Sequence, residues 1–213
     1  MALFKGQLEK NLPESAVFHV WTKRYPSVRA AKEYYDSILK QAKEIFGNEE
    51  SSTKCIRSAA FLVWMKKYPS VEKAKSDYDS IYAQAKATFG NDESTASLVK
   101  TATSLVWARK IYPSVGAAKE AYDSIYARAT EIFNSQSEKS VLRSAAFLVW
   151  MGKYSSVVRA KEARDSILWK TQEVFGNNES TAELVPSATN LVWKKAYPSV
   201  ELARKAFDSI FAD

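Results

Sequence analysis

The amino-acid sequence predicts an all-α fold made of five tandem helical hairpins of about 43 residues each. Two observations carry this prediction: tryptophans recur at a fixed interval, and an Asp-Ser-Ile triplet recurs at nearly the same interval. The tryptophans are spaced 43 residues apart, at Trp21, Trp64, Trp107, Trp150 and Trp193. The triplets are spaced 43, 44, 42 and 43 residues apart and begin at Asp36, Asp79, Asp123, Asp165 and Asp208.

The repeats follow one another without a linker, which favours a single domain over residues 1–213. Their approximate bounds are 1–46, 47–89, 90–133, 134–175 and 176–213. The period is close to that of HEAT and armadillo repeats, which is a likeness of architecture only. Hairpins of this kind stack into an open solenoid or close into a ring, and the sequence leaves both alternatives open.

The second helix of each repeat is the better defined one. Counted from the valine that follows Pro-Ser, the apolar positions are 0, 3, 7, 10 and 14, which form one stripe along an α-helix. In the second repeat these residues are Val71, Ala74, Tyr78, Ile81 and Ala85. The preceding serine is a predicted N-cap, and the glycine of Phe-Gly-Asn is predicted to end the helix in a left-handed conformation.

The first helix of each repeat ends just before Tyr-Pro, because proline disfavours helical geometry in the residue that precedes it. Its apolar positions lie 9, 5, 2 and 1 residues before the tryptophan, and again form one face. In the second repeat these are Cys55, Ala59, Leu62 and Val63. The short connections make the two helices antiparallel neighbours.

Composition excludes several classes of protein. The longest apolar run covers the seven residues 59–65, far short of the ~18 that span a bilayer, so no membrane span is expected. A single cysteine excludes an intramolecular disulfide and favours a reducing compartment, by default the cytoplasm. With one histidine and no glycine-rich phosphate loop, we expect no cofactor, no metal site and no enzymatic activity. Chemistry based on scattered carboxylates is the exception left open.

Two single residues have structural interpretations. His19 takes the position held by leucine in the other four repeats, which favours a partly buried structural role over a pH-sensitive one. Cys55 corresponds to Leu98, Val141 and Leu184, which favours a buried, inert thiol over a nucleophile.

The Asp-Ser pair of the second helix is unchanged in all five repeats, while the residues at positions 1, 2, 5 and 6 of the same helix vary. A functional interpretation is an array of ligand contacts, one per repeat, at Asp36, Asp79, Asp123, Asp165 and Asp208. The favoured structural interpretation is a hydrogen bond to the adjacent hairpin or its turn. A lysine or arginine four residues earlier can also pair with the aspartate.

Basic residues follow each tryptophan, and antiparallel stacking is expected to align them along one edge of the array. We call this set the basic edge; it consists of Lys23, Arg24, Lys66, Lys67, Arg109, Lys110, Lys153, Lys194 and Lys195. The opposite turns carry acids, at Glu49, Glu50, Asp92, Glu93, Glu138 and Glu179. Complementation of helix dipoles explains this charge pattern without any function. Otherwise the basic edge contacts an acidic partner or a phosphate backbone.

Repeat four departs most from the pattern. Gly152 and Ser155 replace the usual residues, and Arg164 replaces an aromatic residue. Trp169 stands where other repeats have lysine or alanine. An arginine and an exposed tryptophan are typical of an interaction hot spot, although drift of one repeat explains them equally well.

These observations favour a non-catalytic binding or scaffold protein that presents a helical surface to a protein partner. The alternative is a protein that binds nucleic acid or another polyanion through the basic edge, as the net charge of +7 permits. A third hypothesis is a carrier that holds an apolar ligand between its helix layers.

The first and last repeats keep the internal apolar pattern instead of a polar outer face. Phe4 lies 17 residues before Trp21, the same interval as from Phe133 to Trp150, so the sequence is expected to begin on the last turn of a second helix. We therefore expect the two ends to meet, within one molecule or between molecules. The other expectation is that the first dozen residues fold back as a cap.

Overall fold

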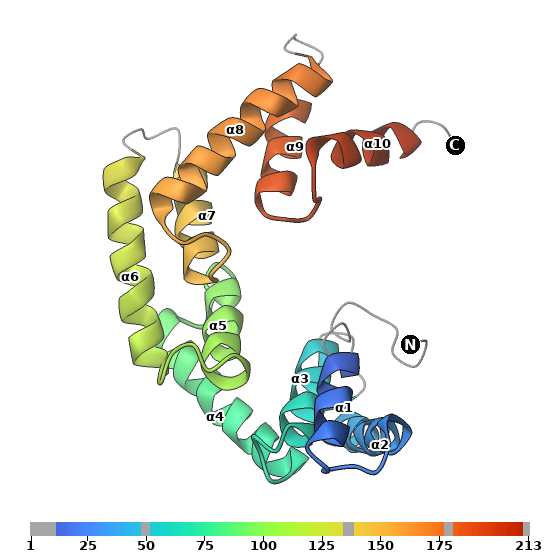
Figure 1. Cartoon of the computed structure of the whole chain (residues 1–213). Coiled ribbons are helices and arrows are strands. Elements are labelled where there is room, and N and C mark those ends of the chain that lie inside the picture. The colour runs from blue at the N-terminus through green and yellow to red at the C-terminus, as the bar shows by residue number, and fades with distance from the viewer. Residues whose placement is uncertain (1–11, 48–51, 134–138, 177–180, 211–213) are drawn as a thin grey trace. The chain divides into compact units, whose positions relative to one another are not determined.

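The computed structural model describes residues 12–47, 52–133, 139–176 and 181–210. Within these ranges the regular structure is entirely helical, which confirms the all-α class (Figure 1). The α-helices are α1 (Leu12–Trp21), α2 (Val28–Phe46), α3 (Thr53–Trp64), α4 (Val71–Phe89), α5 (Ala96–Thr103), α6 (Val115–Ile132), α7 (Lys139–Trp150), α8 (Val157–Phe175), α9 (Leu184–Trp193) and α10 (Val200–Ile210). One π-helical segment, η3 (Ser104–Ala108), continues α5.

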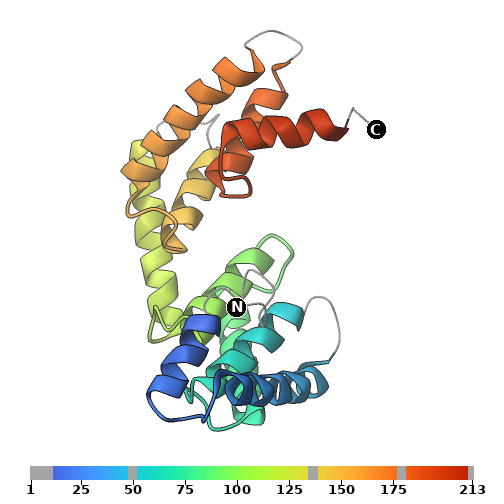
Figure 2. The same cartoon turned by 45° about the vertical axis from the view of Figure 1, so that its right-hand side comes forward.

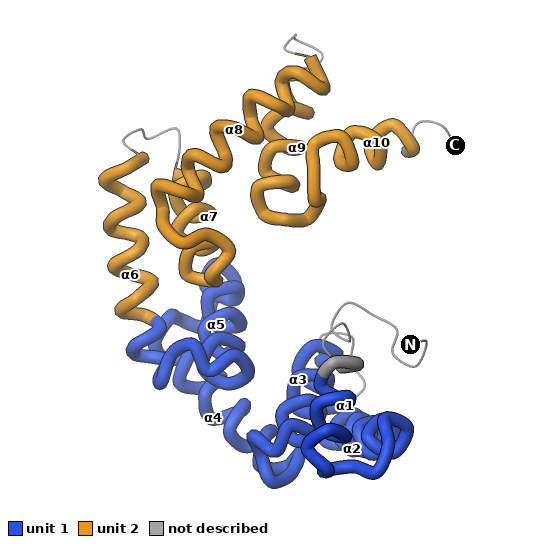
Figure 3. Tube along the Cα trace, in the orientation of Figure 1, with its two compact units in different colours: residues 1–118 blue, residues 119–213 orange. Residues whose placement is uncertain are grey.

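The chain divides into two compact units, residues 1–118 and residues 119–213 (Figure 3). In the first unit α2 packs against α1, α3 and α4, and its neighbours α1 and α3 can be followed in Figure 2. In the second unit α8 packs against α7, α9 and α10. The single-domain organisation, the solenoid and the ring stay predictions.

The second helix of each repeat begins where the sequence predicts, at the valine after a capping serine. The serine hydroxyl accepts a hydrogen bond from the backbone N–H three residues later, at 3.1–3.3 Å in all five repeats. This bond satisfies one of the N–H groups that a helix N-terminus leaves without an intrahelical partner. The capping residues are Ser27, Ser70, Ser114, Ser156 and Ser199.

The glycine of Phe-Gly-Asn ends α2, α4 and α8 as predicted, but in a different conformation. Gly47, Gly90 and Gly176 have φ of 81°, 104° and 84° and ψ of 163°, 166° and 165°. The positive φ was expected, whereas this ψ lies outside the left-handed helical region. Such a combination is accessible to glycine almost alone, which explains why this turn uses that residue.

The left-handed helical position occurs instead at the other turn, and lysine fills it. Lys23, Lys66, Lys110 and Lys195 have φ of 57°, 57°, 51° and 64°, and Gly152 stands at this position in repeat four with φ of 73°. The helix before it closes with two backbone bonds, of which Lys66 N–H to Val63 O (2.9 Å) and Lys67 N–H to Leu62 O (2.8 Å) are an example. This pattern is a Schellman motif with lysine at the C′ position.

The π-helical segment explains the irregular spacing of the triplets. Repeat three has one more residue between its tryptophan and the following valine than the other repeats. The helix widens at that point, so that Arg109 N–H bonds to Ser104 O at 3.0 Å, five residues back. The preceding residues stay in register, and Trp107 keeps the buried position of the other internal tryptophans.

The tryptophans join consecutive repeats in the core. Within the first unit, Trp64 Nε1 donates to Ala31 O at 3.1 Å and Trp107 Nε1 donates to Ala74 O at 2.9 Å. Within the second unit, Trp193 Nε1 donates to Ala160 O at 2.8 Å. Each acceptor is a fully buried alanine, 33 residues before its tryptophan, on the second helix of the preceding repeat. Trp21 differs from these tryptophans, because its side chain is 78% exposed.

Candidate binding edge

The basic edge lies at the turns that connect the two helices of each repeat. In the first unit, the turn before α2 lies close to the turn before α4, because the ring of His19 contacts Arg24 Nη1 at 3.4 Å and Met65 Sδ, next to Lys66, at 3.3 Å. The turn before α6 adjoins them, since Lys110 Nζ contacts Tyr68 of the preceding turn. The first unit therefore brings together Lys23, Arg24, Lys66, Lys67, Arg109 and Lys110, and all six are exposed.

In the second unit the edge comprises Lys153, Lys194 and Lys195, which are also exposed. The turns before α8 and α10 are neighbours here too. Lys195 Nζ lies 5.2 Å from the centre of the Tyr154 ring, and Tyr154 donates its hydroxyl proton to Trp193 O at 3.0 Å. That bond satisfies a carbonyl at the end of α9, so the tyrosine of one turn stabilises the helix end of the next.

A lysine also lies over a tyrosine ring of the preceding turn in the first unit. Lys110 Nζ lies 5.2 Å from the centre of the Tyr68 ring and donates to its hydroxyl at 3.0 Å. The two pairs show that part of the edge serves the contact between repeats. A cation over an aromatic face at an exposed site contributes about 0.5–1 kcal/mol.

Carboxylates pair with most of the cations on the second helices, but not with the lysines of the basic edge. The second helices carry ion pairs between residues three or four positions apart, including Arg29–Glu33, Lys73–Asp77 and Lys170–Glu173. Among the described residues, no ion pair forms at Lys23, Arg24, Lys66, Lys67, Lys110, Lys153, Lys194 or Lys195. The positive charge at the turns is therefore available to a partner.

The left-handed lysines add a second observation. A residue with a Cβ in this conformation costs roughly 1–2 kcal/mol, a cost that glycine avoids. Gly152 shows that the turn closes with glycine, since its backbone has the same positive φ. Lysine nevertheless occupies the position in the other four repeats. Strained residues that recur in this way are typical of functional positions.

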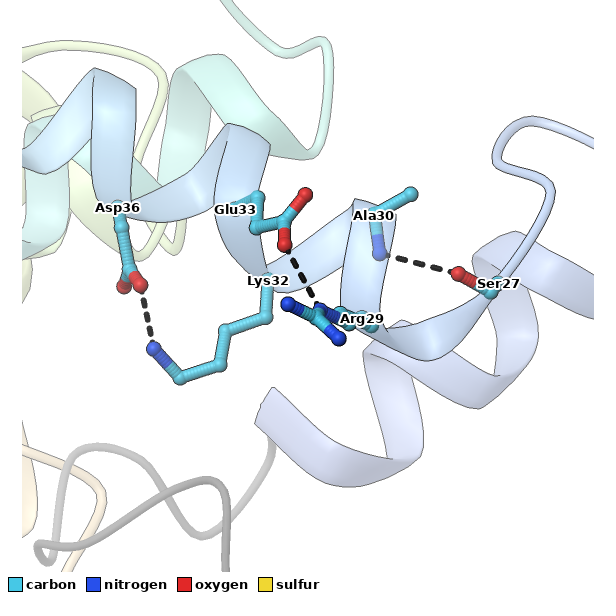
Figure 4. Close-up of polar contacts among 6 residues, drawn as sticks. All are labelled: Ser27, Arg29, Ala30, Lys32, Glu33 and Asp36. Atoms are coloured by element: carbon cyan, nitrogen blue, oxygen red, sulfur yellow. Dashed lines mark hydrogen bonds and ion pairs between the residues drawn. The ribbon is translucent and has the colours of Figure 1, made fainter.

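The repeated aspartates lie on the exposed surface of the second helices. Each of the five pairs with the lysine or arginine four residues earlier, as the sequence allowed. Figure 4 shows the Lys32–Asp36 pair on α2, beside the Arg29–Glu33 pair and the Ser27 cap. The following serine is exposed in every repeat as well. The favoured expectation, a hydrogen bond to the adjacent hairpin, is therefore not what the structure shows for the aspartates, and the interpretation as ligand contacts stays a prediction.

Arg164 and Trp169 do not form one surface. Trp169 is 67% exposed, as predicted. Arg164 occupies the position of α8 that corresponds to Tyr35 on α2, and its side chain is only 19% exposed. Five residues along an α-helix rotate a side chain by about 140°, so the two point in different directions. The structure supports an exposed aromatic residue here, but not a hot spot made of both.

His19 is fully buried between α1 and α3, deeper than expected. Its Nε2 lies 3.3 Å from Met65 Sδ, and its Nδ1 lies 3.4 Å from Arg24 Nη1. Because a guanidinium only donates, Nδ1 must accept, which assigns the hydrogen to Nε2. Burial, together with the positive charges of Arg24 and Lys66, lowers the pKa of the imidazole below its usual value.

Cys55 is half-buried instead of buried, and it lies beside Tyr78. Burial raises the pKa of the Tyr78 phenol, and a hydrogen bond with Cys55 adds to the effect. Tyr78 in turn stacks on Tyr82, with the ring centres 5.8 Å apart. These contacts agree with a structural thiol.

The acidic turns are described at one place. There Asp92 Oδ1 accepts hydrogen bonds from Ser94 Oγ at 2.6 Å and Thr95 N–H at 2.9 Å, which lower the pKa of this carboxyl. Glu93 is exposed. The predicted acids Glu49, Glu50, Glu138 and Glu179 lie outside the described residues.

A cavity of about 210 Å³ adjoins this turn, and its lining combines charged residues, among them Lys86, Asp92 and Glu93, with the apolar residues Ala96 and Val99. Ligand sites usually enclose about 300–1,000 Å³ and are mostly apolar. This cavity therefore gives the hypothesis of an apolar-ligand carrier no support.

Two absences hold for the described part of the chain. None of its helices is long and apolar enough to cross a bilayer. Within the same residues, no group of three or more His, Cys, Asp or Glu side chains is placed to hold a metal ion.

No protein-family model, curated protein or solved structure matches this chain. The functional argument therefore depends on the contacts and charges described above.

Proposed function

We propose that this chain is a non-catalytic helical-repeat binding protein that uses the basic edge to hold a protein partner with an acidic surface. The observation that carries the proposal is a contrast in pairing: most cations on the second helices are ion-paired, whereas the basic-edge lysines have no carboxylate partner. Lysine at a left-handed position that glycine can fill adds support.

A protein partner is favoured over a phosphate backbone because the turns are not purely cationic. Ile111 is exposed beside Arg109 and Lys110, and Pro26, Pro69, Pro113 and Pro198 are exposed at the corresponding turns. Protein interfaces combine apolar anchors with a charged rim, whereas most contacts to nucleic acid go to phosphate and sugar. We place the protein in a reducing compartment such as the cytoplasm, which its single cysteine favours.

Nucleic acid is the second candidate, favoured by the cluster of exposed cations in the first unit. Phosphate contacts release counterions, so affinity for nucleic acid falls steeply as salt concentration rises. Pull-down from native lysate, with and without nuclease, separates the two candidates. A protein partner retained after nuclease treatment supports the proposal, and loss of all bound material after nuclease supports nucleic acid.

Charge reversal tests the edge itself. The variant K66E/K67E/R109E/K110E is expected to lose the partner while its circular dichroism stays that of the wild type. The matched control is R29E/K32E/K73E/K75E, which changes the net charge equally on helices where these cations are already ion-paired. Binding retained by the control and lost by the edge variant supports the proposal. Equal loss in both would show a general charge effect, and tight binding by the edge variant would contradict the proposal.

A further inference from the structure

A single type of junction joins consecutive repeats within each unit. The tryptophan of one repeat lies on the second helix of the preceding repeat and donates to an alanine carbonyl at its third position after the valine. In the first unit an aromatic residue four positions further along packs against the indole: the ring centres are 5.5 Å apart for Tyr35–Trp64 and 5.1 Å apart for Tyr78–Trp107. In the second unit Arg164 stands at this position. The indoles at these junctions are almost completely buried.

Helix α1 carries the same junction face, but exposed. Trp21 is 78% exposed and Val17, one turn earlier, is 58% exposed. The equivalents of Val17 in the other repeats are buried in every case; they are Ala60, Thr103, Ala146 and Thr189. Phe18 adds to the exposed patch, with its ring centre 6.1 Å from that of Trp21.

Helix α10 carries the complementary half. Ala203 stands at the third position after Val200, where Ala31, Ala74 and Ala160 accept their bonds. Phe207 stands at the position of Tyr35 and Tyr78. Among the described elements, α10 packs against α8 and α9, whereas α2 also receives the following first helix, α3.

We propose that α10 of one copy binds α1 of a second copy through this junction, so that the protein associates head to tail. Trp21 Nε1 donates to Ala203 O of the second copy, and its ring packs against Phe207 of that copy. A second copy is the favoured occupant because the interface it offers is the one that the chain already forms between its own repeats. The contact consists of a single helix–helix junction, so we expect the association to be weak and concentration-dependent. This inference is independent of the basic edge.

Complementary variants test the polarity of the contact. W21E and F207E each destroy one half of the junction and leave the other half intact. Sedimentation equilibrium of the wild type is expected to show a mass that rises with concentration, while each variant alone stays monomeric. An equimolar mixture of the two is expected to form a dimer and nothing larger, because only one pair of intact faces remains. A mixture that stays monomeric overturns the proposal, as does a wild type that stays monomeric into the millimolar range.

A photocrosslinker identifies the occupant without altering α10. Benzoylphenylalanine in place of Val17 keeps Trp21 and reacts with whatever covers this face. The expected product is a covalent dimer whose linked peptide contains residues 200–210. A monomeric adduct to residues 1–11 would identify a cap formed by the same chain, and a dimer linked through α1 of both copies would identify a head-to-head contact. Either product, or a monomeric adduct to α10, would overturn the proposal.

Discussion

Trp107 Nε1 donates to the backbone carbonyl of Ala74 at 2.9 Å, across 33 residues of sequence. The indole lies 2% exposed, and the Tyr78 ring packs against it. One side chain thus supplies both the apolar area and the polar contact that join two repeats.

Substitution Trp107→Ala is expected to lower the free energy of unfolding by about 3–5 kcal/mol, as for other buried large aromatic residues. Denaturant titration monitored by circular dichroism measures the change. The matched control is Trp21→Ala, which removes the same side chain from an exposed position and is expected to cost less than about 1 kcal/mol. Similar losses in both variants would contradict the assigned difference in burial.

Stability is expected to fall as pH falls below about 6.5, the ordinary pKa of histidine. The folded state lowers the pKa of His19, so below the unfolded-state pKa the unfolded chain binds a proton that the folded chain does not. This contribution to stability is complete above pH 6.5 and decreases as pH falls toward the folded-state pKa. Melting temperatures between pH 5 and 8 measure it, and His19→Leu, which introduces the residue of the other repeats, is expected to remove this part of the pH dependence.

Lys66→Gly is expected to raise the free energy of unfolding by roughly 0.5–1 kcal/mol. Glycine removes the left-handed strain, which costs about 1–2 kcal/mol. Part of this gain is offset because glycine also increases the backbone entropy of the unfolded chain. Gly152→Ala is expected to do the reverse, because a Cβ there meets no atom within 4 Å and adds backbone strain alone. If lysine is kept for binding, Lys66→Gly also weakens partner binding. A less stable Lys66→Gly variant would show that the side chain contributes more to the fold than the strain costs.

Asp79→Ala is expected to change stability by less than about 0.5 kcal/mol, because its ion pair with Lys75 is exposed. Asp77→Ala is the control, since Asp77 forms a similar pair with Lys73 on the same helix but does not recur in every repeat. If Asp79 contacts a ligand, its substitution reduces partner binding and that of Asp77 does not. Equal binding by the two variants would contradict the interpretation as ligand contacts, and the ion pair within the helix would then be the role of the repeated aspartates.

Periodicity was sufficient to predict the helices because each begins or ends at a residue with a local physical cause. Ser70 caps α4, and Gly90 ends it in a conformation that other residues avoid. The left-handed lysines were not predicted, since lysine has no preference for that geometry and only the backbone shows it. The π-helical segment left a signal, the one extra residue in repeat three, but its location could not be inferred from spacing.

The candidate site was predicted in composition but not in detail. The basic edge could be found because its residues follow each tryptophan. The lack of carboxylate partners at its lysines could not be inferred, since ion pairing depends on where the side chains of neighbouring turns lie. The exposure of Trp21 was missed for a similar reason: its local sequence resembles that of Trp64, and only the absence of a described helix packed on it distinguishes the two.

The direction of the tryptophan bond also bears on how the chain folds during synthesis. Each indole bonds to an alanine 33 residues nearer the N-terminus. A junction can therefore close once its tryptophan has left the ribosome, and it requires nothing synthesised later. Contacts of such short sequence separation form quickly, and folding during translation starts from the N-terminal side. A growing chain of this design buries Trp64, Trp107 and Trp193 each on a helix that is already complete.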